Sequence, residues 1–476
     1  MLPDRLTLAP IARFQGTVTL PGSKSLSNRI LLLSALASGE TEVTRVLASE
    51  DTEVMIAALR ALGVTIRGEP GAGALHVTGK GRPLDAPPGA GAAELFLGNA
   101  GTAMRPLTAV LAAGRGAFVL KGVPRMHERP IGDLLDGLRQ LGVNVRCLER
   151  EGYPPLRIEA RGLPGGTARI SGATSSQFLS ALLLAAPLAR APVRIEIVDR
   201  LVSEPYVDMT LALMARYGVR VSRAGGAPAG LADGTGLADG TVLADGAGLA
   251  DGAGLADGAG PLRYDIAAPQ AYRSPGRVLV EGDASSASYF LAGAAITGGT
   301  VRVEGCGSDS LQGDAQFAAV LGRMGARVRY EPGAIEVEGR GALRGIDADL
   351  TAMPDAAMTL AVAALFARGP TTLRGIGNWR VKETDRMAAV SAELAKLGAR
   401  TESGAGTLVV HPPERVRSAS IATYNDHRMA MAFSLAACGG QPVVIENPAC
   451  VAKTFPGYFD ELARVTVPAP PAQERP

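Results

Sequence analysis

Cysteine, histidine and aromatic residues are scarce in this chain, and neither sign of charge is in excess. The 476 residues include four cysteines and four histidines, and aromatic residues make up 4%. The cysteines show no close paired spacing and have no histidine nearby; they are Cys147, Cys306, Cys438 and Cys450. We therefore expect buried thiols in a reducing cytoplasm, and neither disulfides nor a metal site.

Long apolar runs and clustered charges are absent as well. No apolar run reaches the roughly 18 residues that a membrane-spanning helix needs, and Met1–Arg5 lacks the layout of a signal peptide. The net charge is +2 at pH 7, with Lys and Arg spread along the chain. These features predict a cytoplasmic protein with neither a membrane nor a nucleic acid as its partner.

The chain does contain an internal repeat. In each copy a short turn rich in Gly, Asn or Asp runs into an almost wholly apolar stretch. Successive starts lie roughly 70 to 80 residues apart once a low-complexity insert is set aside. The six starts are Gly22, Gly98, Gly172, Gly282, Pro354 and Asn425. A fixed period of this kind predicts one structural unit used six times.

A second helical pattern follows in each copy. Between Arg129 and Val143, leucines recur at the spacing of a half-buried helix, opposite Asp133 and Arg139. Glycines stand where five of these helices would end in a left-handed C-cap: Gly63, Gly142, Gly218, Gly325 and Gly398. Alternating apolar and polar segments predict strands around both helices. Each copy is thus an α/β unit of about βαβαββ, with one helix apolar all round and one amphipathic.

Charged and hydroxyl side chains stand at the starts of the apolar helices. They are Lys24, Arg29, Arg105, Ser175, Ser176, Asp355, His427 and Arg428. N-capping alone could explain the Ser and Asp residues. A cation in the first turn opposes the helix dipole, however, so several cations together indicate a bound anion.

Length and composition suggest how the copies are grouped. A chain of 476 residues exceeds the roughly 250–300 that one core supports, so two domains of three copies each are expected. The insert, residues 224–260, contains five hexapeptides of the form Leu-Ala-Asp-Gly-x-x. These would make fewer than two coils of a β-helix, so a flexible, acidic surface loop is the better interpretation.

Seven motifs, in the same order along the chain, closely resemble those of the EPSP synthase (3-phosphoshikimate 1-carboxyvinyltransferase) family, and the likeness as a whole runs from about Leu20 to Tyr458. They are Leu20–Arg29 (LPGSKSLSNR), Leu97–Pro106 (LGNAGTAMRP), Pro124–Pro130 (PRMHERP), Ser175–Gln177 (SSQ), Glu281–Ser286 (EGDASS), Asn378–Arg386 (NWRVKETDR) and Asn425–Arg428 (NDHR). Seven motifs in order are far more specific than one.

The resemblance implies a fold and an activity. The family's fold is an inverse α/β barrel of the EPT type: two lobes, each with three βαβαββ units around buried parallel helices. Here the lobes would be residues 21–280, and 1–20 plus 281–476, with a disordered Pro-rich tail from 467 to 476. The reaction moves the enolpyruvyl group of phosphoenolpyruvate to the 5-hydroxyl of shikimate 3-phosphate and releases phosphate. No metal or cofactor takes part, and the family's usual state is a monomer.

Site residues carry over from the matching motifs. Shikimate 3-phosphate would bind Lys24, Ser25, Arg29, Ser175, Ser176, Gln177, Ser203, Tyr206, Asp355, Asn378 and Lys382. Phosphoenolpyruvate would bind Lys24, Asn99, Gly101, Arg129, Gln177, Arg386, Arg428 and Lys453. Arginines suit this task because their planar fork meets carboxylate and phosphate oxygens two at a time.

The resemblance also implies catalytic roles. Asp355 would be the base at the 5-hydroxyl and Glu383 the acid at the methylene carbon, while Lys24 could share the proton transfer. As the first residue of a predicted helix, Glu383–Arg400, Glu383 could instead satisfy the helix dipole. Arg105 could be purely structural, and His427 could be either a ligand contact or a buried structural group.

Two alternative functions fit the sequence less well. The related transferase that acts on UDP-N-acetylglucosamine carries a reactive cysteine in the loop matching Met104–His127, where this chain has no cysteine. A non-catalytic RNA-end-binding protein would need a basic surface with interleaved aromatics, which the composition does not offer. Finally, Gly101 and Pro106 match the family's pattern for enzymes that are sensitive to the inhibitor glyphosate.

Overall fold

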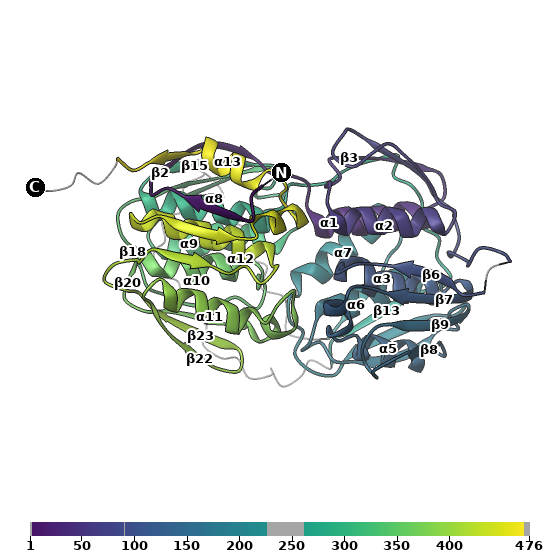
Figure 1. Ribbon diagram of the computed structural model, residues 1–476. Coiled ribbons are helices and arrows are strands. Elements are labelled where there is room, and N and C mark those ends of the chain that lie inside the picture. The colour runs from purple at the N-terminus through teal and green to yellow at the C-terminus, as the bar shows by residue number, and fades with distance from the viewer. Residues whose placement is uncertain (1, 90, 226–260, 471–476) are drawn as a thin grey trace, which may run out of the picture. The chain divides into compact units, whose positions relative to one another are not determined.

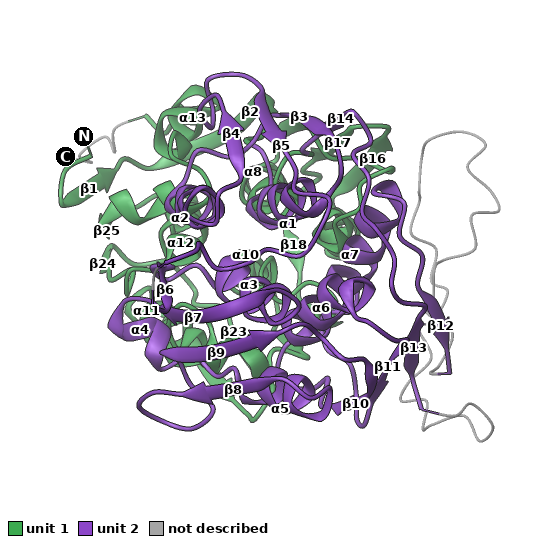
Figure 2. Cartoon of the chain, turned by 90° about the vertical axis from the view of Figure 1, so that its right-hand side faces the viewer, with its two compact units in different colours: residues 1–21, 239–245, 281–476 green, residues 22–238, 246–280 purple. Residues whose placement is uncertain are grey.

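The computed structural model describes residues 2–89, 91–225 and 261–470. Contacts within the chain define two compact units, which Figure 2 colours separately. Unit 1 contains Met1–Pro21 and Glu281–Pro476, and unit 2 lies between Gly22 and Val280. The five hexapeptides of the insert fall in residues 226–260, outside the described residues, and the expectation of a flexible loop there stays a prediction.

Unit 2 contains three repeats (Figure 1). The first has α1 (Lys24–Leu36), β3 (Glu40–Thr44), α2 (Glu50–Ala61), β4 (Thr65–Arg67) and β5 (Leu75–Thr78). The second has β6 (Ala93–Phe96), α3 (Gly101–Ala112), β7 (Arg115–Lys121), α4 (Pro124–His127), α5 (Gly132–Gln140), β8 (Asn144–Cys147) and β9 (Leu156–Arg161). The third has β10 (Gly166–Ile170), α6 (Ser176–Ala185), η1 (Ala186–Leu188), β11 (Val193–Ile197), α7 (Pro205–Arg216), β12 (Ser222–Ala224) and β13 (Arg263–Ile266), and β14 (Arg277–Leu279) ends the unit.

Unit 1 begins with β1 (Arg5–Leu8) and β2 (Ile11–Thr19) and continues after residue 281. Its first repeat has α8 (Ala284–Thr297), β15 (Thr300–Glu304), η2 (Gly313–Gln316), α9 (Phe317–Arg323), β16 (Arg327–Glu331) and β17 (Ala334–Glu338). The next has β18 (Leu343–Arg344), β19 (Asp347–Asp349), α10 (Ala357–Ala363), η3 (Ala364–Phe366), β20 (Ala367–Arg368), β21 (Thr371–Arg374), η4 (Gly377–Val381), α11 (Arg386–Lys396), β22 (Arg400–Ser403) and β23 (Thr407–His411). The last has β24 (Ala419–Ile421), α12 (His427–Ser434), η5 (Leu435–Gly439), β25 (Val443–Glu446), η6 (Pro448–Lys453), α13 (Tyr458–Arg464) and β26 (Thr466–Pro468).

In three of the repeats, the strands form one mixed sheet with the same order. In the third repeat, β10 pairs in parallel with β11, β11 pairs antiparallel with β13, and β13 pairs antiparallel with β12. The sheets β6-β7-β9-β8 and β19-β21-β23-β22 have the same order. The predicted βαβαββ unit is therefore confirmed.

Two repeats exchange their first strands. β2 precedes α1 in sequence but pairs in parallel with β15 of unit 1. β14 precedes α8 but pairs in parallel with β3 of unit 2. The last sheet is completed by β1 from the start of the chain, which pairs antiparallel with β25. Each unit therefore depends on a strand that the chain supplies just before it crosses to the other unit.

The apolar helices form the centre of each unit: α1, α3 and α6 in unit 2, and α8, α10 and α12 in unit 1. Every residue of α8 from Ala284 to Ala295 is buried, as an all-apolar helix requires. Packing is close, since a Cβ on Gly293 would come within 2.5 Å of the Phe14 ring. Polar residues in the first turns of these helices are consequently buried too.

The amphipathic helices end as predicted. The five glycines proposed as C-caps have φ values between 76° and 114°, the left-handed region that glycine tolerates best. None of the helices in the described ranges is both long and apolar enough to cross a membrane.

The structure differs from the sequence-based predictions in three details. Ala224, assigned to the insert, is the last residue of β12. Val467 and Pro468, assigned to a disordered tail, pair with β2 in β26, because an edge strand tolerates a proline that cannot donate. The structure describes all four cysteines and none is in a disulfide, but only Cys306 is buried and the others are half-buried.

Candidate functional site

The densest group of charges in unit 1 surrounds Arg386, the first residue of α11. Its side chain is 1% exposed and contacts three carboxylates. Nη1 donates to Asp355 at 2.8 Å, Nη2 to Glu383 at 2.9 Å, and Nε to Asp426 at 2.8 Å. Burial opposes the charge, but these three carboxylates outweigh burial and raise the pKa of Arg386 above its usual range.

Asp355 is the second centre of this group. Besides Arg386, it accepts from Nη2 of Arg428 at 3.0 Å and lies 3.4 Å from Nζ of Lys382. Burial favours the neutral acid, but Arg428, Lys382 and Arg386 outweigh burial and hold the pKa of Asp355 well below its usual range. The carboxylate therefore stays ionised throughout the neutral pH range.

Local structure explains how these side chains meet. Asp355 lies just before α10, and Asp426 is the N-cap of α12, where it accepts from the Arg428 N–H at 2.9 Å. Asp385 caps α11 by accepting from Ala388 N–H at 3.1 Å. Helix α11 therefore starts at Arg386, and Glu383 lies in the preceding loop. The interpretation of Glu383 as a helix-start carboxylate is wrong.

The loop between β21 and α11 supplies further candidates. Trp379 is fully buried, and its indole N–H donates to the Pro354 carbonyl at 2.7 Å. This bond fixes η4 beside Asp355. Within the described part of the chain, Oδ1 of the neighbouring Asn378 is buried without a hydrogen-bond partner, which suits a group that binds a ligand hydroxyl.

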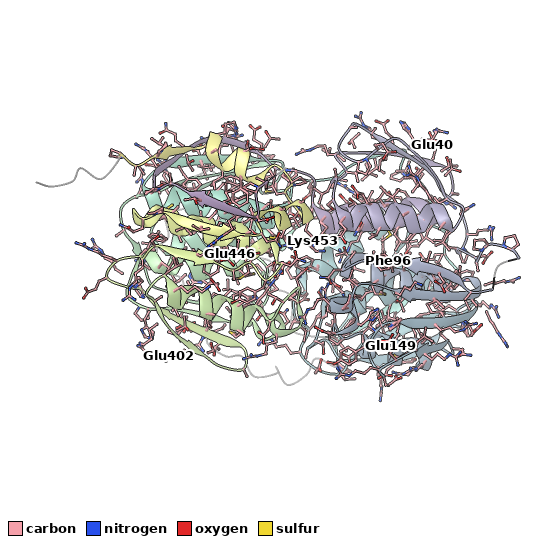
Figure 3. The ribbon with its side chains drawn as sticks, in the orientation of Figure 1. Glu40, Phe96, Glu149, Glu402, Glu446 and Lys453 are labelled. Atoms are coloured by element: carbon pink, nitrogen blue, oxygen red, sulfur yellow. The ribbon has the colours of Figure 1, made fainter. Side chains whose placement is uncertain are left out.

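Two other candidates in unit 1 lie on neighbouring segments. Lys453, labelled in Figure 3, is the last residue of η6. His427 is 1% exposed and starts α12, with Nδ1 3.5 Å from Asp426. The helix containing His427 packs against η6.

In unit 2, Lys24 and Arg29 lie about one and a half turns apart on α1. Lys24 Nζ lies 3.4 Å from Asp51 in the first turn of α2, and both side chains are buried. Arg29 is 5% exposed, and its hydrogen bonds go to the Thr210 hydroxyl at 2.8 Å and the Ser25 carbonyl at 3.0 Å.

Arg29 is a buried cation whose hydrogen-bond partners are neutral. Burial lowers its pKa to about 10, so it is still charged at neutral pH. No carboxylate among the described residues lies within ion-pair distance of it. A buried charge without a counter-ion is unfavourable, and an anionic ligand would offset this cost.

A second cationic group in unit 2 surrounds the start of α3. Nη1 of Arg129 donates to both the carbonyl and the side-chain oxygen of Asn99, each at 3.0 Å. Arg105 Nη2 donates to the Pro130 carbonyl at 3.1 Å. Gly101 opens α3 against both guanidinium groups. Arg105 and Arg129 are each 4% exposed.

The hydroxyl candidates lie at the starts of α6 and α7. Ser175 is the N-cap of α6 and accepts from Gln177 N–H at 3.3 Å, and Ser176 is the first helical residue. Ser203 has a φ of 55° and is 5% exposed. Its carbonyl accepts from the Tyr206 N–H at 3.1 Å.

The structure thus brings together Asp355, Lys382, Glu383, Arg386 and Arg428 in unit 1, whereas the unit 2 candidates form separate groups on α1, α3 and α6. Sequence reasoning missed Asp426 and Asp51. Asp426 stands inside the Asn425–Arg428 motif and could have been found there. Asp51 carries no signal beyond its place in the first turn of a helix.

Comparisons with known proteins point to one family. A family model described as EPSP synthase (3-phosphoshikimate 1-carboxyvinyltransferase) matches residues 8–242 and 260–462. The chain is 52% identical over 463 residues to the 3-phosphoshikimate 1-carboxyvinyltransferase of Serratia proteamaculans, covering 97% of this chain and 99% of the relative. It is 50% identical over 475 residues to the chloroplastic 3-phosphoshikimate 1-carboxyvinyltransferase of Solanum lycopersicum. That match covers 97% of this chain and 84% of the relative.

A solved structure supports the fold. The EPSP synthase of Acinetobacter baumannii superposes with a TM-score of 0.74 at 25% identity, covering 97% of this chain and 98% of that one. The expected EPT-type fold class is thereby confirmed.

Proposed function

Because the chain belongs to the EPSP synthase family, we propose that it transfers the enolpyruvyl group of phosphoenolpyruvate to the 5-hydroxyl of shikimate 3-phosphate. The observation that carries this proposal is the identity of about 50% to curated transferases over nearly the whole chain. UDP-N-acetylglucosamine as acceptor and a non-catalytic role are not favoured, because these relatives bear the name of the first activity.

The residues proposed for each substrate follow from the motifs shared with the family. Phosphoenolpyruvate would be held by arginine and lysine side chains with help from nearby neutral groups: Lys24, Asn99, Gly101, Arg129, Gln177, Arg386, Arg428 and Lys453. Shikimate 3-phosphate would be held by hydroxyls, amides and further charged groups: Lys24, Ser25, Arg29, Ser175, Ser176, Gln177, Ser203, Tyr206, Asp355, Asn378 and Lys382. Charge-assisted hydrogen bonds of this number explain how two multiply charged anions can be held together.

The proposed chemistry is addition followed by elimination. The 5-hydroxyl oxygen attacks the central carbon of phosphoenolpyruvate as its proton passes to Asp355, while Glu383 gives a proton to the methylene carbon. The tetrahedral intermediate then loses phosphate while the Glu383 carboxylate takes back a methyl proton, which restores the double bond. Lys24 could share the proton transfer. These steps need no metal or cofactor.

Electrostatics suggest how Asp355 becomes a base. Its pKa is held low by Arg428, Lys382 and Arg386 despite burial, and a carboxylate with so low a pKa accepts protons poorly. Phosphoenolpyruvate brings carboxylate and phosphate charges to Arg386 and Arg428. Sharing these cations with the substrate would raise the pKa of Asp355 when a proton has to be accepted.

A direct assay tests the proposal. The purified protein should release inorganic phosphate when given phosphoenolpyruvate and shikimate 3-phosphate, and should not do so with UDP-N-acetylglucosamine. Phosphate release with the nucleotide sugar alone would assign the chain to the related transferase. No release with either acceptor would contradict an enzymatic function.

A second expected result concerns Arg29. At about 100 times its dissociation constant, shikimate 3-phosphate should stabilise the wild type by roughly 2.7 kcal/mol. Arg29→Gln should lose most of this gain, yet the ligand-free variant should melt no lower than the wild type, because a buried charge without a counter-ion is removed. Melting temperatures with and without ligand measure both effects.

Arg194→Gln is the matched control for Arg29→Gln, because Arg194 lies in the same unit but pairs at the surface with Asp265. Its ligand-induced stabilisation should equal that of the wild type. A full ligand response in Arg29→Gln would remove Arg29 from the proposed site.

Three further properties are proposed: the oligomeric state, inhibition and the cellular compartment. We propose a monomer that is inhibited by glyphosate in competition with phosphoenolpyruvate. The tomato relative is named chloroplastic, whereas four free thiols suit a reducing cytoplasm, which we propose for this chain.

A further inference from the structure

A turn with unfavourable backbone geometry precedes the Arg428 helix. Tyr424 and Asn425 have φ values of 53° and 54°, and the Asp426 N–H donates to the Thr423 carbonyl at 2.8 Å. Two successive positive φ values closed by such a bond are the pattern of a type I′ turn, which favours Gly, Asn and Asp. A tyrosine with this φ is costly and persists only when its surroundings hold it in place. We call residues 423–426 the Tyr424 turn.

Glu393, two turns along α11 from Arg386, holds the entry of the Tyr424 turn. Its side chain is fully buried, and one oxygen accepts from the Ala422 N–H at 3.1 Å. The other accepts from the Tyr424 hydroxyl at 2.9 Å. Partial burial and this hydrogen bond raise the pKa of Tyr424 to about 12, so the hydroxyl remains a donor at neutral pH.

The same helix holds the exit of the turn. Asp426 accepts from Arg386 Nε at 2.8 Å and from the Arg428 N–H at 2.9 Å. Lys396, in the last turn of α11, pairs with Glu393 at 2.7 Å and donates to the Ser420 carbonyl at 3.2 Å. The chain between β24 and α12 is therefore fixed to α11 on both sides of its two left-handed residues.

We propose that Glu393 and Tyr424 are positioning residues. The hydrogen bond between them holds the Tyr424 turn closed and so keeps Arg386 and Arg428 in position to bind phosphoenolpyruvate. This inference rests on the proposed function of the two arginines. Neither Glu393 nor Tyr424 touches the reacting atoms; both act through the backbone of the turn and the Asp426 carboxylate.

The expected consequence is selective for one substrate. If the turn relaxes, only part of the molecules presents Asp426 and Arg428 correctly, and apparent affinity falls by that fraction. Tyr424→Phe removes one hydrogen bond to a charged group, so the KM for phosphoenolpyruvate should rise by roughly three- to tenfold. The turnover number and the KM for shikimate 3-phosphate should change by less than about twofold.

Three variants make the experiment specific. Tyr424→Phe is the test, and it should fold because Tyr424 is 45% exposed. Tyr330→Phe is the matched control, since Tyr330 in β16 of the same unit also donates its hydroxyl, to the Ala315 carbonyl at 3.0 Å. Tyr424→Gly is the rescue, because it also lacks the hydroxyl but glycine lowers the cost of the left-handed conformation at the strained position.

Kinetics and hydrogen exchange should agree. Tyr424→Phe should raise the KM for phosphoenolpyruvate and speed amide exchange in residues 422–428, Tyr330→Phe should do neither, and the rescue should recover most of both changes. An unchanged KM in Tyr424→Phe overturns the inference. So does an equal rise for both substrates, which would indicate a purely structural role. An inactive wild type would contradict the proposed function. Amide exchange does not depend on enzymatic activity and would still report on the Tyr424 turn.

Discussion

Asp355→Asn and Glu383→Gln should each lower kcat by at least about 10²-fold while the fold stays intact, the scale of lost general acid–base catalysis. Both carboxylates contact Arg386, at 2.8 and 2.9 Å. The amides keep the shape and can still accept from the guanidinium, but they cannot take up or give a proton at neutral pH. Asp426 continues to neutralise Arg386 in either variant.

Two surface substitutions provide controls with the same chemistry. Asp347→Asn breaks an exposed two-bond pair with Arg374, at 2.8 and 2.6 Å. Glu402→Gln alters an exposed carboxylate that contacts His411 at 3.0 Å; Figure 3 labels Glu402. Both control variants should release phosphate at the wild-type rate. A kcat near wild type in Asp355→Asn or Glu383→Gln would remove that residue from its catalytic role.

The pH dependence gives a second measure of Asp355. In the free protein its pKa lies well below the usual range, because three cations outweigh burial. A base must be ionised, so the acid limb of kcat/KM, which reports the free enzyme, should lie below the usual titration range of an aspartate. The acid limb of kcat, which reports the complex with substrates, should lie at higher pH, because bound anions share those cations.

Local sequence signals predicted much of the framework. The repeat period, the buried helices and the five left-handed glycines depend on residues close together in the chain, and the structure places them as expected. Motifs also located Asp355, Lys382, Arg386 and Arg428, since each stands within a few residues of a helix start.

Pairs between distant segments were not predictable in the same way. Asp426 looked like an ordinary N-cap, and its bond to Arg386 joins residues 40 positions apart. Glu393 sits on the buried face of an amphipathic helix, where spacing alone suggests an apolar residue. Its role becomes visible only when β24 and α11 are seen side by side, since Glu393 bonds to the segment that follows β24.

The second large effect concerns glyphosate and Gly101. The wild type should be inhibited in competition with phosphoenolpyruvate, because a carboxylate and a phosphonate at a similar separation suit the same cations. Gly101→Ala should raise the inhibition constant relative to the KM for phosphoenolpyruvate by at least about tenfold, which corresponds to roughly 1.4 kcal/mol of selective loss.

The side chains around Gly101 explain this expectation and also predict that phosphoenolpyruvate itself binds less well. A methyl group there would overlap Nη1 of Arg105 and come within 3.0 Å of Nη2 of Arg129. Both side chains are long enough to move, but they are 4% exposed and Arg129 is bonded to Asn99. Some rise in the KM for phosphoenolpyruvate is therefore expected as well. The longer inhibitor should lose more, because it has less space to follow the displaced guanidinium groups.

Gly132→Ala is the matched control for this comparison. Gly132 opens α5 as Gly101 opens α3, and a methyl group on it would meet only Gly152, at an ordinary 3.4 Å from its Cα. That variant should keep the wild-type KM and inhibition constant. A wild type indifferent to millimolar glyphosate would contradict the proposed inhibitor. A Gly101→Ala enzyme whose inhibition constant and KM rise by the same factor would instead show that crowding at Arg129 acts on both ligands alike, and the steric account of selectivity would then be wrong.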